Sequence, residues 1–170
     1  MMDKQRFDKI YADTAARLRR YVNHMIGNSP DSDDVMQETY LRMLTASPAH
    51  LSDHQVKSYL FATATNIVRD LWRRGVVAGQ WVPLEDECIA APFDAEAMDR
   101  TIDLPNAMKS LPLMHRSLLW LAYAEGYTHR EIAAIAGIKE ESVRVILFRA
   151  RQKFISVFQK SNLTRKEQPR

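Results

Sequence analysis

Arginines with the spacing of a single helix are the first residues of this sequence that suggest chemistry. Arg144, Arg149 and Arg151, together with Phe148, project from much of one predicted helix surface. The other side of the same helix is apolar, and its residues are Val143, Ile146, Leu147 and Ala150. A helix of this kind can pack on its own domain by the apolar side and enter the major groove of DNA with the basic side.

A shorter helix, just before the basic one, carries its own start and stop signals. Thr128 and Glu131 have the spacing of a capping box, in which a hydroxyl and a carboxylate each satisfy a backbone N–H. Gly137 ends this helix, because glycine enters the left-handed conformation without steric cost. The two helices and their glycine turn predict a helix-turn-helix. The alternative is an ordinary helical hairpin with a solvated basic face.

Acids gather at the start of another predicted helix, and they are Asp31, Asp33, Asp34 and Glu38. Acids in a first turn complement the helix dipole by about 0.3–1 kcal/mol each. An exposed acidic ridge with apolar neighbours also suits docking onto a basic partner, and both interpretations can hold together. No histidine or further carboxylate has convincing ligand spacing, so we expect no metal site in this segment.

The segment VKSYLFATATNIVRDLWRR, residues 56–74, interleaves aromatic and basic side chains. Such a mixture suits single-stranded nucleic acid, where the stacking of one base yields about 1–3 kcal/mol. The alternative, which we favour for Phe61 and Trp72, is that the aromatics belong to the core and the arginines to a solvated face. Asn66 lies in the basic face, where its carboxamide can pair with a base edge.

Composition and charge indicate an all-α protein with two basic parts. The chain has 170 residues, 46% of them hydrophobic, with only 5 glycines and long stretches of helix-period pattern. The net charge is +3, but residues 76–105 hold seven acids and one base. Positive charge therefore concentrates in the two flanking segments, as expected if each approaches phosphates.

Several classes of site and function are excluded by what the sequence contains. The single cysteine, Cys88, excludes an internal disulfide and a multi-cysteine zinc site. No apolar run approaches the roughly 18 residues that span a membrane, and the N-terminus lacks the apolar core of a signal peptide. We therefore expect a soluble, cytoplasmic protein without direct membrane insertion. Without a Ser/His/Asp group, phosphate loop or metal spacing, we expect no enzyme, no catalytic residue, no metal and no cofactor.

The helical patterns divide the chain into two domains. Four patterns fill residues 3–75; the first is long enough to hold two helices with a break, and the next starts with Asp31 or Ser32 as N-cap. Glycine, proline and acids dominate residues 76–103, which indicates a linker with a short helix around DAEAMDRTI. The predicted division is an N-terminal helical bundle (1–75), a flexible acidic linker (76–103), a C-terminal helix-turn-helix bundle (104–160) and a basic, frayed tail (161–170).

Three motifs in order resemble the bacterial sigma factors of the extracytoplasmic-function group. They are DSDDVMQETYLRML, YLFATATNIVRDLWRR and LPLMHRSLLWLAYAEGYTHREIAAIAGIKEESVRVILFRAR. The resemblance covers about residues 5–158. It implies two helical domains on a flexible linker, and a factor that directs RNA polymerase to promoters.

The resemblance also implies roles for individual residues. Those in the place that grips core RNA polymerase are Asp33, Asp34, Gln37, Glu38 and Leu41. Those in the place that opens and reads the −10 promoter element are His50, Asp53, His54, Lys57, Asn66, Arg69 and Arg73. Asn66 falls where the family has an asparagine beside a flipped-out base. Those in the place that reads the −35 element or contacts its phosphates are Arg130, Arg144, Val145, Phe148, Arg149 and Arg151.

The partners implied by the resemblance are promoter DNA and core RNA polymerase, through the beta-prime clamp and the beta flap. The family commonly works with a membrane-anchored anti-sigma protein that clamps the two domains together, and the linker would allow such folding. No residue identifies that partner.

The sequence departs from the family at the start of the basic helix. Lys139, Glu141 and Ser142 stand where a polar cap, a glycine and a threonine are usual, and Ile146 replaces a common arginine. We therefore expect one missing phosphate contact and a −35 sequence that analogy does not predict. A stand-alone helix-turn-helix regulator with an N-terminal sensing or dimerisation domain is the alternative function.

Overall fold

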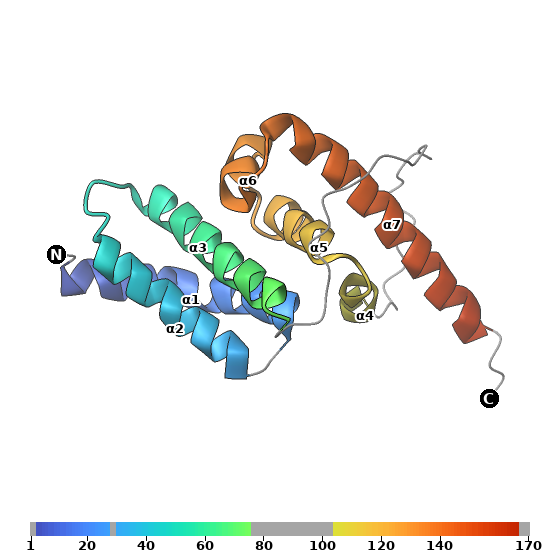
Figure 1. Ribbon diagram of the computed structural model, residues 1–170, viewed down its shortest axis with the longest axis horizontal. Coiled ribbons are helices and arrows are strands. Elements are labelled where there is room, and N and C mark those ends of the chain that lie inside the picture. Colours follow the sequence, from blue (N-terminus) through green and yellow to red (C-terminus); the bar gives the residue numbers. More distant parts are fainter. Residues whose placement is uncertain (1–2, 28–29, 76–103, 167–170) are drawn as a thin grey trace.

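The structure of the protein is a computed structural model that describes residues 3–27, 30–75 and 104–166. The regular structure in these ranges is entirely helical. In chain order the elements are α1 (Lys4–Ile26), α2 (Pro30–Ala46), α3 (Asp53–Arg73), α4 (Leu104–Lys109), α5 (Leu113–Leu119), the π-helical turn η1 (Trp120–Ala124), α6 (His129–Ala136) and α7 (Glu140–Lys166) (Figure 1). The predicted all-α class is confirmed. The predicted linker and its short helix lie outside the described residues.

The first three helices pack against one another. α1 is continuous, so the prediction of a break inside the first pattern is wrong. Its apolar stripe is buried without interruption, with Leu18 and Val22 fully covered, and a continuous stripe needs no second helix. A capping box starts α3, in which the backbone N–H of Gln55 donates to the Ser52 hydroxyl and the Gln55 side chain accepts from the Ser52 N–H.

The start of α2 also differs from the prediction. The helix begins at Pro30, so Asp31 and Ser32 lie inside its first turn and neither is the N-cap. Proline suits this position, because its fixed φ is helical and its missing N–H would have no partner in the helix. Ser32 is fully buried there, whereas Asp33 remains exposed near the positive end of the helix dipole.

The second group of helices forms around α5, α6 and α7. α5 continues directly into η1, where the hydrogen bonds widen by one residue and the N–H of Glu125 reaches the carbonyl of Trp120. α7 continues through Lys166. The prediction of a frayed tail is therefore wrong for residues 161–166.

The two groups of helices share one apolar core and touch along α3 and α1. In Figure 1, α6 lies beside α3, while α5 packs on α1. Tyr21 of α1 is fully buried at this junction, and its hydroxyl lies 2.7 Å from the hydroxyls of both Thr65 and Ser117. The guanidinium of Arg116 donates across the same junction to the carbonyls of His24 and Met25, at 3.3 and 3.4 Å. Polar contacts therefore accompany the apolar ones.

Candidate nucleic-acid interface

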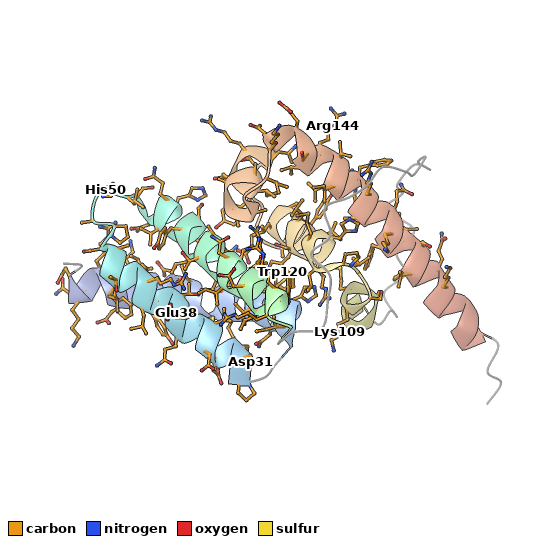
Figure 2. The ribbon with its side chains drawn as sticks, viewed as in Figure 1. Asp31, Glu38, His50, Lys109, Trp120 and Arg144 are labelled. Carbon is orange, nitrogen blue, oxygen red and sulfur yellow. The ribbon has the colours of Figure 1, made fainter. Side chains whose placement is uncertain are left out.

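The residues predicted to read the −10 element lie along α3 and in the loop before it. Figure 2 labels His50 in that loop, at the far end of the N-terminal helices from the start of α2. Asn66 and Arg73 are exposed on α3, whereas Lys57 and Arg69 are partly buried. The aromatics of the same helix are core residues, since Phe61 is fully buried and Trp72 is 7% exposed. The prediction that these two rings belong to the core is confirmed.

Two members of this set form ion pairs within the N-terminal helices. Asp53 accepts from Lys9 at 2.7 Å, and this hydrogen bond lowers the pKa of the Asp53 carboxyl and raises the pKa of the Lys9 ammonium. Arg73 lies 3.6 Å from Asp70, one helical turn away. Both pairs are exposed, so each contributes little stability and can exchange for another partner.

Three other members contact the C-terminal helices. Lys57 lies 3.3 Å from the Glu125 carboxylate, and His54 Nε2 lies 2.5 Å from the Glu131 carboxylate. The Arg69 guanidinium donates to the carbonyl of Ala136, at the end of α6. Burial lowers the pKa of Arg69, with a smaller effect from a neighbouring arginine. The basic side of α3 is thus partly covered by the helix-turn-helix itself.

The helix-turn-helix has the local geometry that the sequence predicts. The Thr128 hydroxyl accepts from the N–H of Glu131, whose carboxylate accepts from the N–H of Thr128 at 2.8 Å. Hydrogen bonds from His54 and Thr128 lower the pKa of Glu131 to about 2. Gly137 follows with φ 67° and ψ 38°, the left-handed conformation expected at the end of α6.

The residues predicted to read the −35 element lie on α6 and on the first half of α7. Arg130, Arg144 and Val145 are exposed, and Figure 2 shows Arg144 pointing away from the body of the protein near the start of α7. Arg151 donates to the Tyr123 hydroxyl at 2.7 Å. The remaining members, which are partly buried, are Phe148 and Arg149.

The apolar side of α7 is buried as predicted, with Val143 fully covered and Leu147 2% exposed. Ile146 is 8% exposed and belongs to the same core. An arginine at that position would have to reach past its neighbours to find a phosphate. Ile146 therefore packs in the core of this chain, at a position where the resemblance led us to expect an arginine.

The residues predicted to bind core polymerase lie on one outer face of α2, where Figure 2 labels Asp31 and Glu38. Leu41 is 51% exposed, and Leu44, one turn further along α2, is 40% exposed. Asp33 pairs with Arg19 at 2.5 Å, and Glu38 pairs with Arg42 at 2.7 Å. The others on this face, both exposed, are Asp34 and Gln37.

The described part of the chain contains neither a group of metal ligands nor a helix that could span a membrane. Among those residues, no three histidine, cysteine, aspartate or glutamate side chains come together as metal ligands would. None of the described helices has the length and apolar character to cross a membrane.

The sequence prediction missed the residues that join the two groups of helices. Glu125 is the main one: its side chain is 4% exposed and lies 3.0 Å from Arg17 as well as 3.3 Å from Lys57. Tyr127 is 5% exposed beside them, and burial raises its pKa to about 12. Both residues follow the end of a helix, and no local pattern distinguishes them from solvent-exposed turn residues.

Two family models match this chain, one over each group of helices. The family model Sigma-70 region 2 matches residues 10–76, and the model Sigma-70, region 4 matches residues 102–154. The ECF RNA polymerase sigma factor SigF of Caulobacter vibrioides is 32% identical over 135 residues, which are 79% of this chain and 75% of that protein. The chain belongs to the ECF sigma factors. This sigma factor is also similar to SigM of Bacillus subtilis, 28% identical over 158 residues that cover 89% of this chain and 94% of SigM.

A solved structure shows the same fold. The sigma factor RpoE of Bartonella quintana, crystallised with the anti-sigma factor NepR, superimposes with a TM-score of 0.68 at 20% identity. The match covers 91% of this chain and 98% of RpoE. As a member of this family, the present sigma factor acts in transcription initiation.

Proposed function

We propose that this sigma factor binds core RNA polymerase through α2, reads and melts the −10 element with α3, and reads the −35 element with α7. The observation that carries the proposal is the position of Asn66. Asn66 is exposed on α3, one turn before Arg69 and two turns before Arg73, on a helix whose apolar side is buried. A carboxamide in such a place offers both a donor and an acceptor to a base edge.

The −10 role requires a base to leave the stack, which costs a few kcal/mol. Contacts between Asn66 and the flipped base would offset this cost for the right sequence only. Lys57, Arg69 and Arg73 would hold the adjacent phosphates, which carry no sequence information but fix the register. Trp72 and Phe61 support the helix from within and are too buried to stack on bases.

The −35 role belongs to the first half of α7. Arg144 and Val145 are the most accessible of its predicted readers, and Arg130, which is also exposed, would contact a phosphate from α6. A single helix-turn-helix with so few cations binds duplex weakly, and its affinity falls steeply with salt. The missing phosphate contact at Ile146 makes this weaker still.

Attachment to polymerase would compensate for the weak affinity of each DNA-binding surface. Leu41 and its acidic neighbours on α2 form an exposed apolar and acidic face that suits a basic groove on the core enzyme. Once α2 is bound, both DNA-binding helices act at high effective concentration on two elements a fixed distance apart. The weak contacts of the two helices with DNA then combine, and together they recognise the promoter specifically.

An anti-sigma protein is the further partner that we propose. RpoE of Bartonella quintana was solved in complex with the anti-sigma factor NepR, and it shares the fold of this chain. A stand-alone regulator is less favoured, because it would need neither the acidic face of α2 nor the exposed Asn66.

The test is transcription with purified components. The full chain is mixed with bacterial core RNA polymerase and sheared genomic DNA, and the 5′ ends of the products are sequenced. We expect transcripts that start downstream of a shared pair of motifs, and none from core enzyme alone. Absence of initiation on every template would contradict the proposal.

A further inference from the structure

The structure places three residues predicted to hold −10 DNA in contact with the C-terminal helices. Lys57 and His54 each face a carboxylate, on Glu125 and Glu131 respectively, while Arg69 faces the carboxyl end of α6. All three partners are negative or partly negative, as phosphates are. The basic side of α3 is therefore already occupied by groups that resemble its expected ligand.

Glu125 is the most deeply placed of these groups. Its side chain is only 4% exposed, and a buried carboxylate is tolerated only when it is paired. It has two cations, Arg17 at 3.0 Å and Lys57 at 3.3 Å, both from the N-terminal helices. The Lys57 ammonium also lies 5.6 Å from the centre of the Tyr127 ring, within the range of a cation–π contact. Lys57 is held from two directions by residues of the C-terminal group.

Arg69 is held at the other end of the same surface. The last carbonyls of a helix have no partner within it and carry the negative end of its dipole. Arg69 donates to one of them, that of Ala136, and its Nη1 lies 3.5 Å from the position that a Cβ on Gly137 would take. Its guanidinium therefore fills the turn of the helix-turn-helix.

The contact covers one DNA-binding surface and leaves the other open. Arg130, Arg144 and Val145 remain exposed while Lys57 and Arg69 are partly buried. The junction also contains hydroxyl groups, such as those of Tyr21 and Ser117, that water can satisfy when the two groups part. Opening therefore exposes polar groups that water can satisfy, together with apolar residues of the shared core such as Phe61 and Tyr127.

We propose that this closed arrangement is autoinhibited: Glu125, Glu131 and the end of α6 act as internal substitutes for promoter phosphates on Lys57, His54 and Arg69. The free chain then binds −10 DNA only after its two groups of helices separate, and it needs no second protein to stay closed. The inference rests on the proposed −10 role of α3, and it adds the mechanism that blocks it.

The test compares two double variants of the full chain. Glu125→Gln/Glu131→Gln removes both substitute charges, and glutamine at position 131 still completes the capping box. Glu140→Gln/Glu141→Gln is the matched control, because it removes two exposed charges from the same group of helices. The probe is a fluorescent single-stranded 12-nucleotide DNA of random sequence, since phosphate contacts do not depend on sequence. Binding is followed by anisotropy over a series of salt concentrations without polymerase.

We expect Glu125→Gln/Glu131→Gln to bind the probe at least about tenfold more tightly than the parent, because a binding state populated below a tenth becomes dominant. The dependence of log affinity on log salt should steepen by about 0.7 for each additional phosphate that the variant neutralises. The control should shift affinity far less. Equal increases in affinity in the two variants would overturn the proposal, since they would reflect net charge alone.

A distance measurement distinguishes separation of the two groups of helices from a simple effect of the changed charge on DNA binding. Spin labels at Thr45→Cys and Ala134→Cys, both exposed positions on opposite groups, are introduced with Cys88→Ser. We expect one narrow distance in the parent and a longer, broader distribution in Glu125→Gln/Glu131→Gln. If the two groups of helices separate but the DNA probe binds no more tightly, the proposed masking of the α3 surface is wrong. A failed transcription assay beside successful opening and binding would instead refute the promoter role and leave the closure intact.

Discussion

Tyr21 of α1 and Ser117 of α5 share a hydrogen bond of 2.7 Å at a fully buried point between the two groups of helices. The Tyr21 hydroxyl also lies 2.7 Å from that of Thr65, so one phenol joins three helices. Burial raises the pKa of Tyr21, and its two hydroxyl partners oppose that rise. The phenol is therefore neutral at physiological pH and acts only through hydrogen bonds.

Tyr21→Phe is expected to lower the free energy of unfolding by about 1–2 kcal/mol, because Ser117 loses its buried partner. Urea denaturation followed by circular dichroism measures the change. Tyr11→Phe is the control: Tyr11 is 47% exposed, and its substitution should cost much less. Equal effects of the two substitutions would show that the network at Tyr21 contributes nothing.

Acidification from pH 6.5 to pH 4 is expected to destabilise the protein. Burial, with a smaller effect of Arg116, lowers the pKa of His24 to about 4; burial, with a smaller effect of Lys153, lowers the pKa of His115 to about 4. Between pH 6.5 and pH 4 these two histidines bind protons in the unfolded chain but not in the folded chain. The free energy of unfolding therefore decreases as the pH is lowered. Melting temperatures across the window measure the slope.

The matched variants distinguish these two histidines from the rest. His24→Gln/His115→Gln should flatten the slope between pH 6.5 and pH 4, whereas His50→Gln/His129→Gln, at exposed positions, should leave it unchanged. The stabilisation from Glu131, whose pKa is lowered to about 2, is present above pH 4.5 and is lost only below it. A slope that survives His24→Gln/His115→Gln would refute the assignment.

Asp34→Lys/Glu38→Lys is expected to weaken binding to core RNA polymerase by about tenfold, because two charges on the proposed docking face of α2 are reversed. Affinity is measured by pull-down or fluorescence with purified core enzyme. Asp8→Lys/Asp13→Lys makes the same change on exposed positions of α1 and serves as the control. If both double variants bind core enzyme as the parent does, α2 is not the docking face.

Asn66→Ala is expected to impair promoter opening by about tenfold while it leaves core binding unchanged, because a base-edge contact is lost and no docking group is touched. Permanganate reactivity of unpaired thymines reports opening, and the binding assay above reports docking. Asp70→Ala, at another exposed position of α3, is the control. Parallel losses of opening and docking would contradict a role for Asn66 at the base.

Local rules predict much of this fold, because the signals lie within a few residues of the structure they determine. Thr128, Glu131 and Gly137 set both ends of α6, and the sequence alone identifies them. The apolar side of α7 follows from its period, although the sequence alone does not show that packing is the reason for Ile146. The class of fold and the helix-turn-helix follow from such patterns.

The junction between the two groups of helices was not predicted, because it depends on contacts between residues far apart in the chain. Glu125 and Lys57 are 68 positions apart by their numbers, and neither has a local pattern that indicates a buried ion pair. Arg116 likewise has the sequence context of a surface arginine, yet it is 8% exposed and donates to carbonyls of α1. Tertiary packing therefore determines whether these charged side chains are buried or exposed.

The His24 ring lies 4.6 Å from the Trp120 ring, centre to centre, and the two come from opposite groups of helices. Figure 2 labels Trp120 at that boundary. When the two groups of helices separate, this ring contact is lost and more of the half-buried Trp120 indole meets water, so its emission should shift to longer wavelengths. Intrinsic fluorescence thereby supplies a label-free optical signal for the state of the molecule in real time.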